Sequence, residues 1–266
     1  MRRHPPPLAL AVIAAPAILA GAADARACSC GGPHVRYLTP DRVDDAPINT
    51  RVRFEVPIHS GPGGTARHVL RVPGSTAEIA VAEQRFAGGG VEVVELTPRA
   101  PLSPSTQYEV AVIDPAEHPG TLVFGTFRTG TTADTTAPTF KQGGAAEAHR
   151  NVRFGGGDCS IRGPWIDVNG LEAADPSRPN AQILWGVWPR GPSGKIDPSK
   201  PPATVVQPWR GVLTIGRRSL CDPRDFPLPD AGVLTFGIAP LDEAGNAGPL
   251  KTYRVDMSAA TPESRR

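Results

Sequence analysis

The 266-residue sequence has no apolar run long enough to cross a bilayer as a helix, so we expect no transmembrane span in the mature chain. It also lacks an excess of one charge. The 28 basic and 26 acidic residues leave a formal net charge of +2, which argues against a nucleic-acid or anionic-membrane partner. No segment shows a helical period over ten residues, so we do not expect a helix-rich enzyme.

Signatures of common enzyme classes are missing as well. There is no Gly-x-Ser-x-Gly elbow and no His-Glu-x-x-His pair, and the segment at 194–196 lacks both the hydroxyl residue and the upstream glycine of a phosphate loop. The glycine triplets at 88–90 and 155–157 do not open helices, so they cannot direct a helix N-terminus at a phosphate. We therefore predict a non-enzymatic protein without a cofactor.

The first 27 residues have the pattern of a cleaved signal peptide. A basic start is followed by an apolar run at 8–23 and then by Ala25-Arg26-Ala27, whose alanines suit signal peptidase. Cleavage before Cys28 predicts an exported protein, which is periplasmic, cell-surface or secreted. A lipid anchor at Cys28 is the alternative, although Ala25 and Arg26 stand where that signal usually has leucine and a small residue.

Cysteine is scarce, with four residues in the chain. Because exported thiols are free to pair, we predict a disulfide between Cys159 and Cys221. Closing a loop of about 60 residues contributes roughly 4 kcal/mol in the chain-entropy model. For Cys28 and Cys30, in the N-terminal segment 28–34, three alternatives stay open: a mutual bridge, a soft metal ion, or a bridge elsewhere.

Short alternating apolar runs, separated by turns that use many of the 31 Pro and 29 Gly, fill most of the remaining chain. This period is typical of half-buried strands and predicts an all-β protein of two tandem immunoglobulin-like β-sandwiches. In the first domain, residues 35–129, we expect strands at 51–56, 68–72, 76–86, 91–96, 107–113 and 121–128. In the second domain, residues 139–257, we expect strands at 165–168, 183–188, 204–207, 212–215, 233–239 and 252–255.

The segments outside these domains have different compositions. Residues 130–138 are rich in threonine and end in proline, which predicts a short exposed linker. Residues 258–266 are expected to be a disordered tail.

Aromatic residues are few, and their positions are informative. Tyr108 follows a turn where an immunoglobulin-like sandwich would place a tyrosine corner, although a tyrosine simply packed on a strand is the alternative. All four tryptophans lie in the second domain, at 165, 185, 188 and 209. We expect them in or beside the core, with an aromatic ligand platform as the alternative.

The first domain contains a set of turn-and-strand motifs, namely Thr39-Pro40-Asp41, Ala46 to Val52, Leu96-Thr97-Pro98, Leu102 to Tyr108, and Gly125 to Thr129. Together they resemble the bacterial Ig-like domain of the surface-layer (SbsA) type. The resemblance implies a module that spaces or presents other structures, or that binds protein or glycan surfaces, without catalytic residues. The expected partner is thus an envelope or extracellular protein or glycan.

The second domain contains Asp242-Glu243-Ala244-Gly245-Asn246, which is similar to a turn of Ig-like and fibronectin type III-like modules of exported bacterial proteins. Asp and Asn side chains bond their own backbone in such turns while Gly takes a positive φ. Calcium binding by these oxygens is an alternative, but the loop alone offers too few carboxylates for a full calcium shell.

Copper binding is the alternative function. Copper-resistance proteins of the CopC type are also exported Ig-like sandwiches, and His34, Asp114 and His118-Pro119 resemble their ligands, with the acid and the histidine spaced Asp-x-x-x-His. Imidazole and carboxylate ligands suit Cu(II). The competing interpretation of 114–120 is a surface loop with an ordinary exposed histidine.

Overall fold

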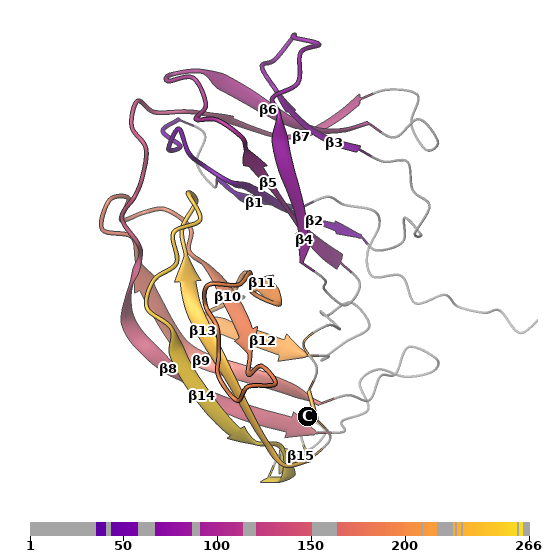
Figure 1. Ribbon diagram of the computed structural model, residues 1–266, viewed down its shortest axis with the longest axis vertical. Coiled ribbons are helices and arrows are strands. Elements are labelled where there is room, and N and C mark those ends of the chain that lie inside the picture. Colours follow the sequence, from indigo (N-terminus) through magenta and orange to yellow (C-terminus); the bar gives the residue numbers. More distant parts are fainter. Residues whose placement is uncertain are drawn as a thin grey trace, which may run out of the picture.

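The computed structural model consists almost entirely of strands, which form two β-sandwiches in tandem (Figure 1). It describes residues 36–40, 44–57, 67–86, 91–113, 121–150, 164–208, 210–216, 226, 228–229, 231–259 and 261–262. Within these ranges there is no α-helix, and hence no helix able to span a membrane. The all-β prediction is confirmed.

The first sandwich pairs a four-stranded sheet with a three-stranded one. The larger sheet has the order β1 (Arg36–Thr39), β2 (Val52–Pro57), β5 (Val91–Pro98), β4 (Val81–Phe86). The smaller has the order β3 (Arg67–Arg71), β6 (Gln107–Ile113), β7 (Thr121–Arg128). Lettered A to G along the chain, the sheets are A-B-E-D and C-F-G, which is the strand order of a constant-type immunoglobulin domain.

A tyrosine corner fixes the start of β6. The Tyr108 hydroxyl accepts a hydrogen bond from the backbone N–H of Ser103 at 2.9 Å, and the residue is only 2% exposed. Its ring stacks on Phe127 of β7, with centroids 5.6 Å apart. The prediction for Tyr108 is therefore confirmed.

The second sandwich is built from two four-stranded sheets. One has the order β12 (Val212–Gly216), β9 (Trp165–Ala174), β8 (Thr139–Arg150), β15 (Thr261–Pro262). The other has the order β11 (Thr204–Val206), β10 (Leu184–Pro189), β13 (Val233–Leu241), β14 (Lys251–Asp256). The fourth strand of this sandwich, β11, pairs with its third strand, β10. In the first sandwich the fourth strand, β4, instead pairs with β5, in the sheet that does not contain the third strand, β3. The chain thus has an Ig/fibronectin III-like fold.

The expected strands are observed, with shifted ends, but β1, β8 and β15 were not predicted. The sequence of β8 is rich in Gly and Ala, which have low β propensity, and a bulge between Phe140 and Gln142 interrupts its alternation. The expectation of a disordered tail at 258–266 is wrong for its first part. Met257–Ala259 form a 3-10 turn, and Thr261–Pro262 pair in parallel with the end of β8.

A buried apolar cluster, here called the interdomain core, joins the two sandwiches. The larger sheet of the first sandwich faces the β11-β10-β13-β14 sheet of the second (Figure 1). The first sandwich contributes Leu38, Phe86 and Val93, and the second contributes Leu184, Trp188, Val205, Ala239 and Leu241. The tryptophan prediction is confirmed for Trp165, Trp185 and Trp188, which are at most 4% exposed; Trp209 lies outside the described residues.

Candidate functional site

The site residues predicted from the sequence lie outside the described part of the chain. This holds for His34, Asp114 and His118 of the copper alternative, and for Cys28, Cys30, Cys159 and Cys221. The structure therefore neither brings these residues together nor separates them. Copper binding and the disulfide stay predictions.

A buried ion pair of the first sandwich lies at the junction with the second. Arg53, on β2, is 1% exposed and donates from Nε to Glu95 Oε2 at 2.7 Å. Its Nη1 donates to the backbone oxygen of Asp242 in the second sandwich at 2.8 Å. Burial opposes the charged form of Glu95, but Arg53 and Arg51 together hold the pKa of that carboxyl below its ordinary value. The cation of one sandwich thereby holds a turn of the other.

The turn that Arg53 contacts is the one predicted at Asp242–Asn246. Asp242 Oδ1 accepts the backbone N–H of Asn246 at 2.8 Å, and Gly245 has a φ of 85°. A Cβ at Gly245 would also collide with the Arg51 side chain of the first sandwich. A backbone hydrogen bond also joins the turn to the first sandwich, since Arg51 N–H donates to Glu243 O at 2.7 Å. The turn prediction is confirmed, and the turn serves as an interdomain contact.

Three carboxylates from three separate segments meet beside this turn. Asp134 of the linker, Asp175 after β9 and Asp242 after β13 each place an oxygen within 4.8 Å of the others, and we call them the carboxylate cluster. They are 6%, 2% and 1% exposed. The prediction of an exposed linker at 130–138 is therefore wrong at Asp134, whose Oδ2 accepts the Ser177 hydroxyl at 2.6 Å.

Burial disfavours the charged form of Asp242 in this cluster, and repulsion from the other two carboxylates adds to that cost. Burial, followed by the charges of Asp134 and Asp175, raises the pKa of Asp242 to about 6, although hydrogen bonds from Asn246 oppose the shift. Carboxylate oxygens are also the ligands that Ca²⁺ prefers, and the cluster offers three toward its usual six to eight or so. Chemically, Asp242 can hold a proton up to about pH 6, or the cluster can hold a hard divalent cation.

Replacing Asp175 by Asn tests the repulsion. Asp175 Oδ1 accepts bonds from the backbone N–H groups of Ser177 and Arg178, and an amide oxygen can keep both. In EDTA we expect the variant to be more stable than the parent at neutral pH by about 1 kcal/mol. Because the folded pKa of Asp242 is raised, the parent loses stability as pH rises from about 4 to about 6, and the variant should lose less.

The matched control for this variant is Asp197→Asn. Asp197-Pro198-Ser199 repeats the Asp-Pro-Ser turn of 175–177, but Asp197 is exposed and outside the cluster. Urea unfolding from pH 4 to 8 measures the free energy of unfolding of the parent and of both variants. A parent and an Asp175→Asn variant with the same pH slope would contradict the repulsion. Repeating the series in calcium chloride separates the two chemistries, because an ion held by the cluster would make Asp175→Asn the less stable protein.

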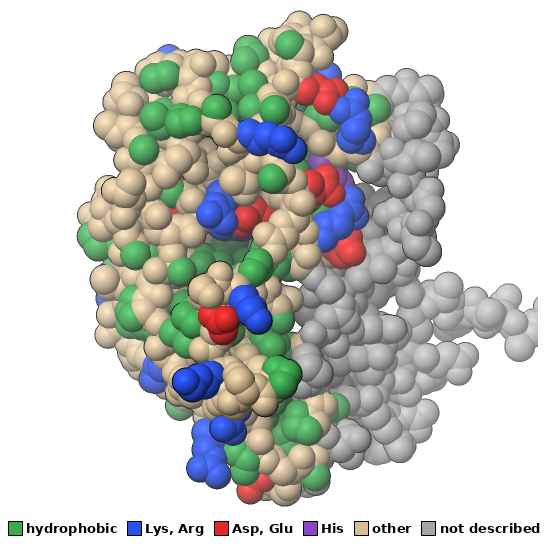
Figure 2. Space-filling model, viewed as in Figure 1, with side chains coloured by type: hydrophobic (Ala, Val, Ile, Leu, Met, Phe, Trp, Pro, Cys, Tyr) green, Lys and Arg blue, Asp and Glu red, His purple; other side chains and the backbone are tan. Residues whose placement is uncertain are grey.

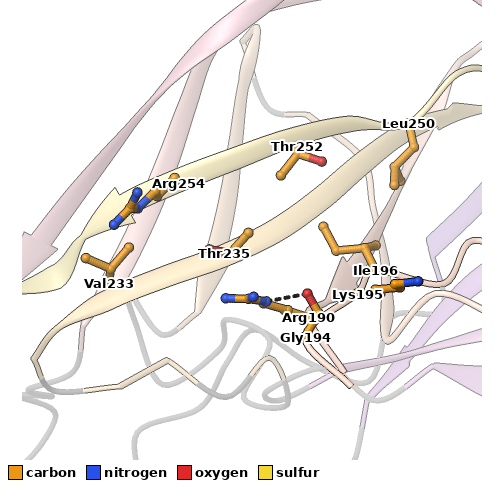
Figure 3. Close-up of a pocket in the computed structure, with 9 residues that line it drawn as sticks. All are labelled: Arg190, Gly194, Lys195, Ile196, Val233, Thr235, Leu250, Thr252 and Arg254. Carbon is orange, nitrogen blue, oxygen red and sulfur yellow. Dashed lines mark hydrogen bonds between the residues drawn. The ribbon is translucent and has the colours of Figure 1, made fainter. Parts of the chain in front are cut away.

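A second candidate region is a groove on the outer face of the β11-β10-β13-β14 sheet, of about 690 Å³ (Figure 3). We call it the cationic groove. Val233 and Thr235 of β13 and Thr252 and Arg254 of β14 form its floor, and Leu250 lies at one end. The remaining lining residues belong to a loop after β10 and are Arg190, Gly194, Lys195 and Ile196.

The loop of the cationic groove is held by its own backbone. Gly191 N–H donates to Lys195 O at 2.8 Å, and Arg190 Nε donates to Gly194 O at 2.5 Å (Figure 3). This closed turn places Arg190 and Lys195 among the residues that line the groove. On the strands, the register places Thr235 directly opposite Arg254, so both project to the outer side.

The cationic groove was not predicted as a site, and of the carboxylate cluster only Asp242 was considered, as part of the calcium alternative at 242–246. The three aspartates are far apart in sequence, so only the fold brings them together. One signal was available for the groove: within the expected strand 252–255, Thr252 and Arg254 alternate with the buried Tyr253 and Val255 and must share the outer face.

Comparisons with known proteins give no family. No family model matches the chain, and no curated protein matches it. Among solved structures, fibronectin(III)-like modules of Clostridium thermocellum CbhA align over 88% of this chain and 100% of theirs, at 8% identity and a TM-score of 0.25. The N-terminal Ig1-2 module of the Drosophila receptor protein tyrosine phosphatase DLAR aligns over 84% and 96%, at 12% identity and a TM-score of 0.28. Because these TM-scores are low, the fold assignment rests on the strand order described above.

Proposed function

We propose that this chain is an exported, non-enzymatic module of the bacterial cell envelope, in which two Ig-like sandwiches form one rigid unit that presents binding surfaces. The first sandwich is proposed to be of the SbsA type, on the motifs that the sequence carries there. The interdomain core carries the proposal, because eight buried apolar residues from both sandwiches meet in it. Domain interfaces that are small and polar permit relative motion, whereas an apolar interface of this kind opposes it.

Buried polar contacts support the same rigid unit. Arg53 is buried at the junction and would be left without its Asp242 oxygen if the sandwiches separated. Thr50 Oγ1 donates to Glu243 O at 3.2 Å, and Asn49 Nδ2 donates to the linker oxygen of Asp134 at 2.7 Å. Unmade buried hydrogen bonds are costly, so these contacts resist hinge motion.

The rigid unit is tested by NMR relaxation on the mature chain. We expect one rotational correlation time for amides of both sandwiches, and a single conformation in small-angle X-ray scattering. Two independent correlation times would contradict the proposal, because sandwiches joined by a free linker tumble separately.

Export and the lack of catalysis need a different measurement. In a bacterial host, cell fractionation and mass spectrometry should find the protein outside the cytoplasm, beginning at Cys28. Unreduced peptide maps should contain a peptide that links Cys159 to Cys221. A cytoplasmic protein that keeps residues 1–27 would contradict export, and turnover of a hydrolase substrate panel that depends on one side chain would contradict the non-enzymatic assignment.

A further inference from the structure

We propose that the cationic groove binds an extended, acidic peptide segment of a partner protein. The proposal rests on the function proposed above, since it names the surface and the partner chemistry of the binding module. It depends on three properties of the groove: unpaired cations, the spacing of these cations along the groove, and a lining of aliphatic and hydroxyl groups.

The basic side chains of the groove differ from most of those on the first sandwich. On that sandwich, ion pairs with glutamates are formed by Arg36, Arg51, Arg53, Arg67, Arg71 and Arg85. Among the described residues, no carboxylate forms an ion pair with Arg190, Lys195 or Arg254. Figure 2 shows the contrast: acidic and basic side chains adjoin on the first sandwich, whereas basic ones gather with few acidic neighbours low on the second.

Unpaired cations in a groove favour an anionic occupant. Guanidinium groups bind carboxylates through paired, charge-assisted hydrogen bonds, and Arg190 and Arg254 supply two such groups. Thr235 lies opposite Arg254 in the strand register, and its hydroxyl can add a bond to the same carboxylate. Charge complementarity therefore selects acidic side chains.

The arrangement of the cations favours an extended segment. Figure 3 shows Arg254 at one end of the groove, Lys195 at the other and Arg190 between them. In an extended peptide, alternate side chains project to one side about 7 Å apart. A strand with acidic residues at alternate positions can thus meet the cations in succession, which a compact anion cannot do.

The remaining lining favours a peptide over an acidic glycan. None of the nine described lining residues is aromatic, so none of them offers a ring on which a sugar could stack. The groove instead offers aliphatic surface from Val233, which is 49% exposed, and from the parts of Ile196 and Leu250 that do not pack against the interdomain core. Apolar side chains of a peptide can cover this surface while its carboxylates reach the arginines.

The test uses the mature chain and a fluorescein-labelled peptide of alternating Glu and Val, with binding followed by fluorescence anisotropy. We expect affinity to fall as salt rises, and Arg254→Gln to weaken binding about tenfold. The double variant Arg190→Gln/Arg254→Gln should weaken it about 30-fold or more. Arg99→Gln, at an exposed arginine of the first sandwich, is the matched control and should change affinity by less than about twofold.

Arg254→Gln is the principal variant because no hydrogen bond of the Arg254 side chain is found among the described residues. The fold therefore does not depend on this side chain, and we expect the variant to keep the thermal midpoint of the parent. The proposal is overturned if the double variant binds like the parent, or if a Gln-Val peptide binds as tightly as the Glu-Val peptide. It is also overturned if hyaluronan binds more tightly than the peptide, or if light scattering shows an Arg254-dependent dimer. A failed peptide experiment leaves the relaxation and export measurements unchanged, so failure of this inference is distinguishable from failure of the proposed function.

Discussion

Replacing Glu95 by Gln is expected to lower the free energy of unfolding by about 3–5 kcal/mol, because it leaves Arg53 as a buried and unpaired cation. Glu95 is 3% exposed and accepts bonds from Arg53 Nε at 2.7 Å and Arg51 Nη1 at 3.0 Å. An amide has one oxygen and no charge, so it cannot balance both guanidinium groups. Urea unfolding at neutral pH measures the loss.

The same strand provides the control for Glu95→Gln. Glu92, also on β5, pairs with Arg85 at 2.9 Å, and both side chains are partly exposed. Glu92→Gln should cost less than about 1 kcal/mol, because water screens an exposed pair. A double variant, Arg53→Met with Glu95→Leu, should regain at least half of the loss. Equal effects of Glu92→Gln and Glu95→Gln would show that burial does not set the strength of the pair.

The pH dependence gives a second check on this pair. The pKa of Glu95 is lowered in the folded state, so its ionised form contributes stability above its ordinary value of 4.5. That contribution is lost as pH falls through the folded pKa. The difference between Glu95→Gln and the parent should therefore shrink in acid, because the parent carboxyl is then protonated as well. A difference that stays constant down to strong acid would contradict the charge argument.

The sequence predicts the individual sandwiches better than their junction. Period-two alternation places Val52, Phe54 and Val56 on one face, and the structure buries all three. Strand β8 could not be predicted in this way. Its core-facing positions include Ala146 and Ala148, and glycines lie nearby, so its buried face has few large apolar residues to mark it. Local patterns identify strands only where large apolar residues mark the buried face.

The junction could not be predicted because its residues contradict the usual rules of burial. Arg53 alternates with Val52 and Phe54 as an outward-facing residue should, and it does face outward from the first sandwich. It is buried because the second sandwich covers that face. Asp134 likewise sits in a threonine-rich linker that any local rule makes exposed, yet the sandwiches enclose it. Sequence patterns of one domain do not report what another domain covers.

Replacing Trp188 by Ala is expected to cost about 3–5 kcal/mol and to uncouple the sandwiches. Trp188 is 4% exposed in the interdomain core, and its Nε1 donates to Lys200 O at 2.8 Å. Its indole lies over Gly186, where a Cβ would approach Cη2 to 2.5 Å, so the missing side chain there makes room for the ring. Alanine at this position leaves the space of the ring empty against the first sandwich.

Trp185→Ala is the matched control, because Trp185 is equally buried on the same strand but faces the core of the second sandwich. Calorimetry should record one transition for the parent. For Trp188→Ala we expect two separated transitions and, in NMR relaxation, two correlation times, because the cavity opens between the sandwiches. Trp185→Ala should lower the midpoint through the second sandwich while the native protein keeps one correlation time. If the two variants behave alike in relaxation, the interdomain core does not hold the rigid unit together, and the polar contacts of Thr50, Arg51 and Arg53 with the 242–243 backbone must do so.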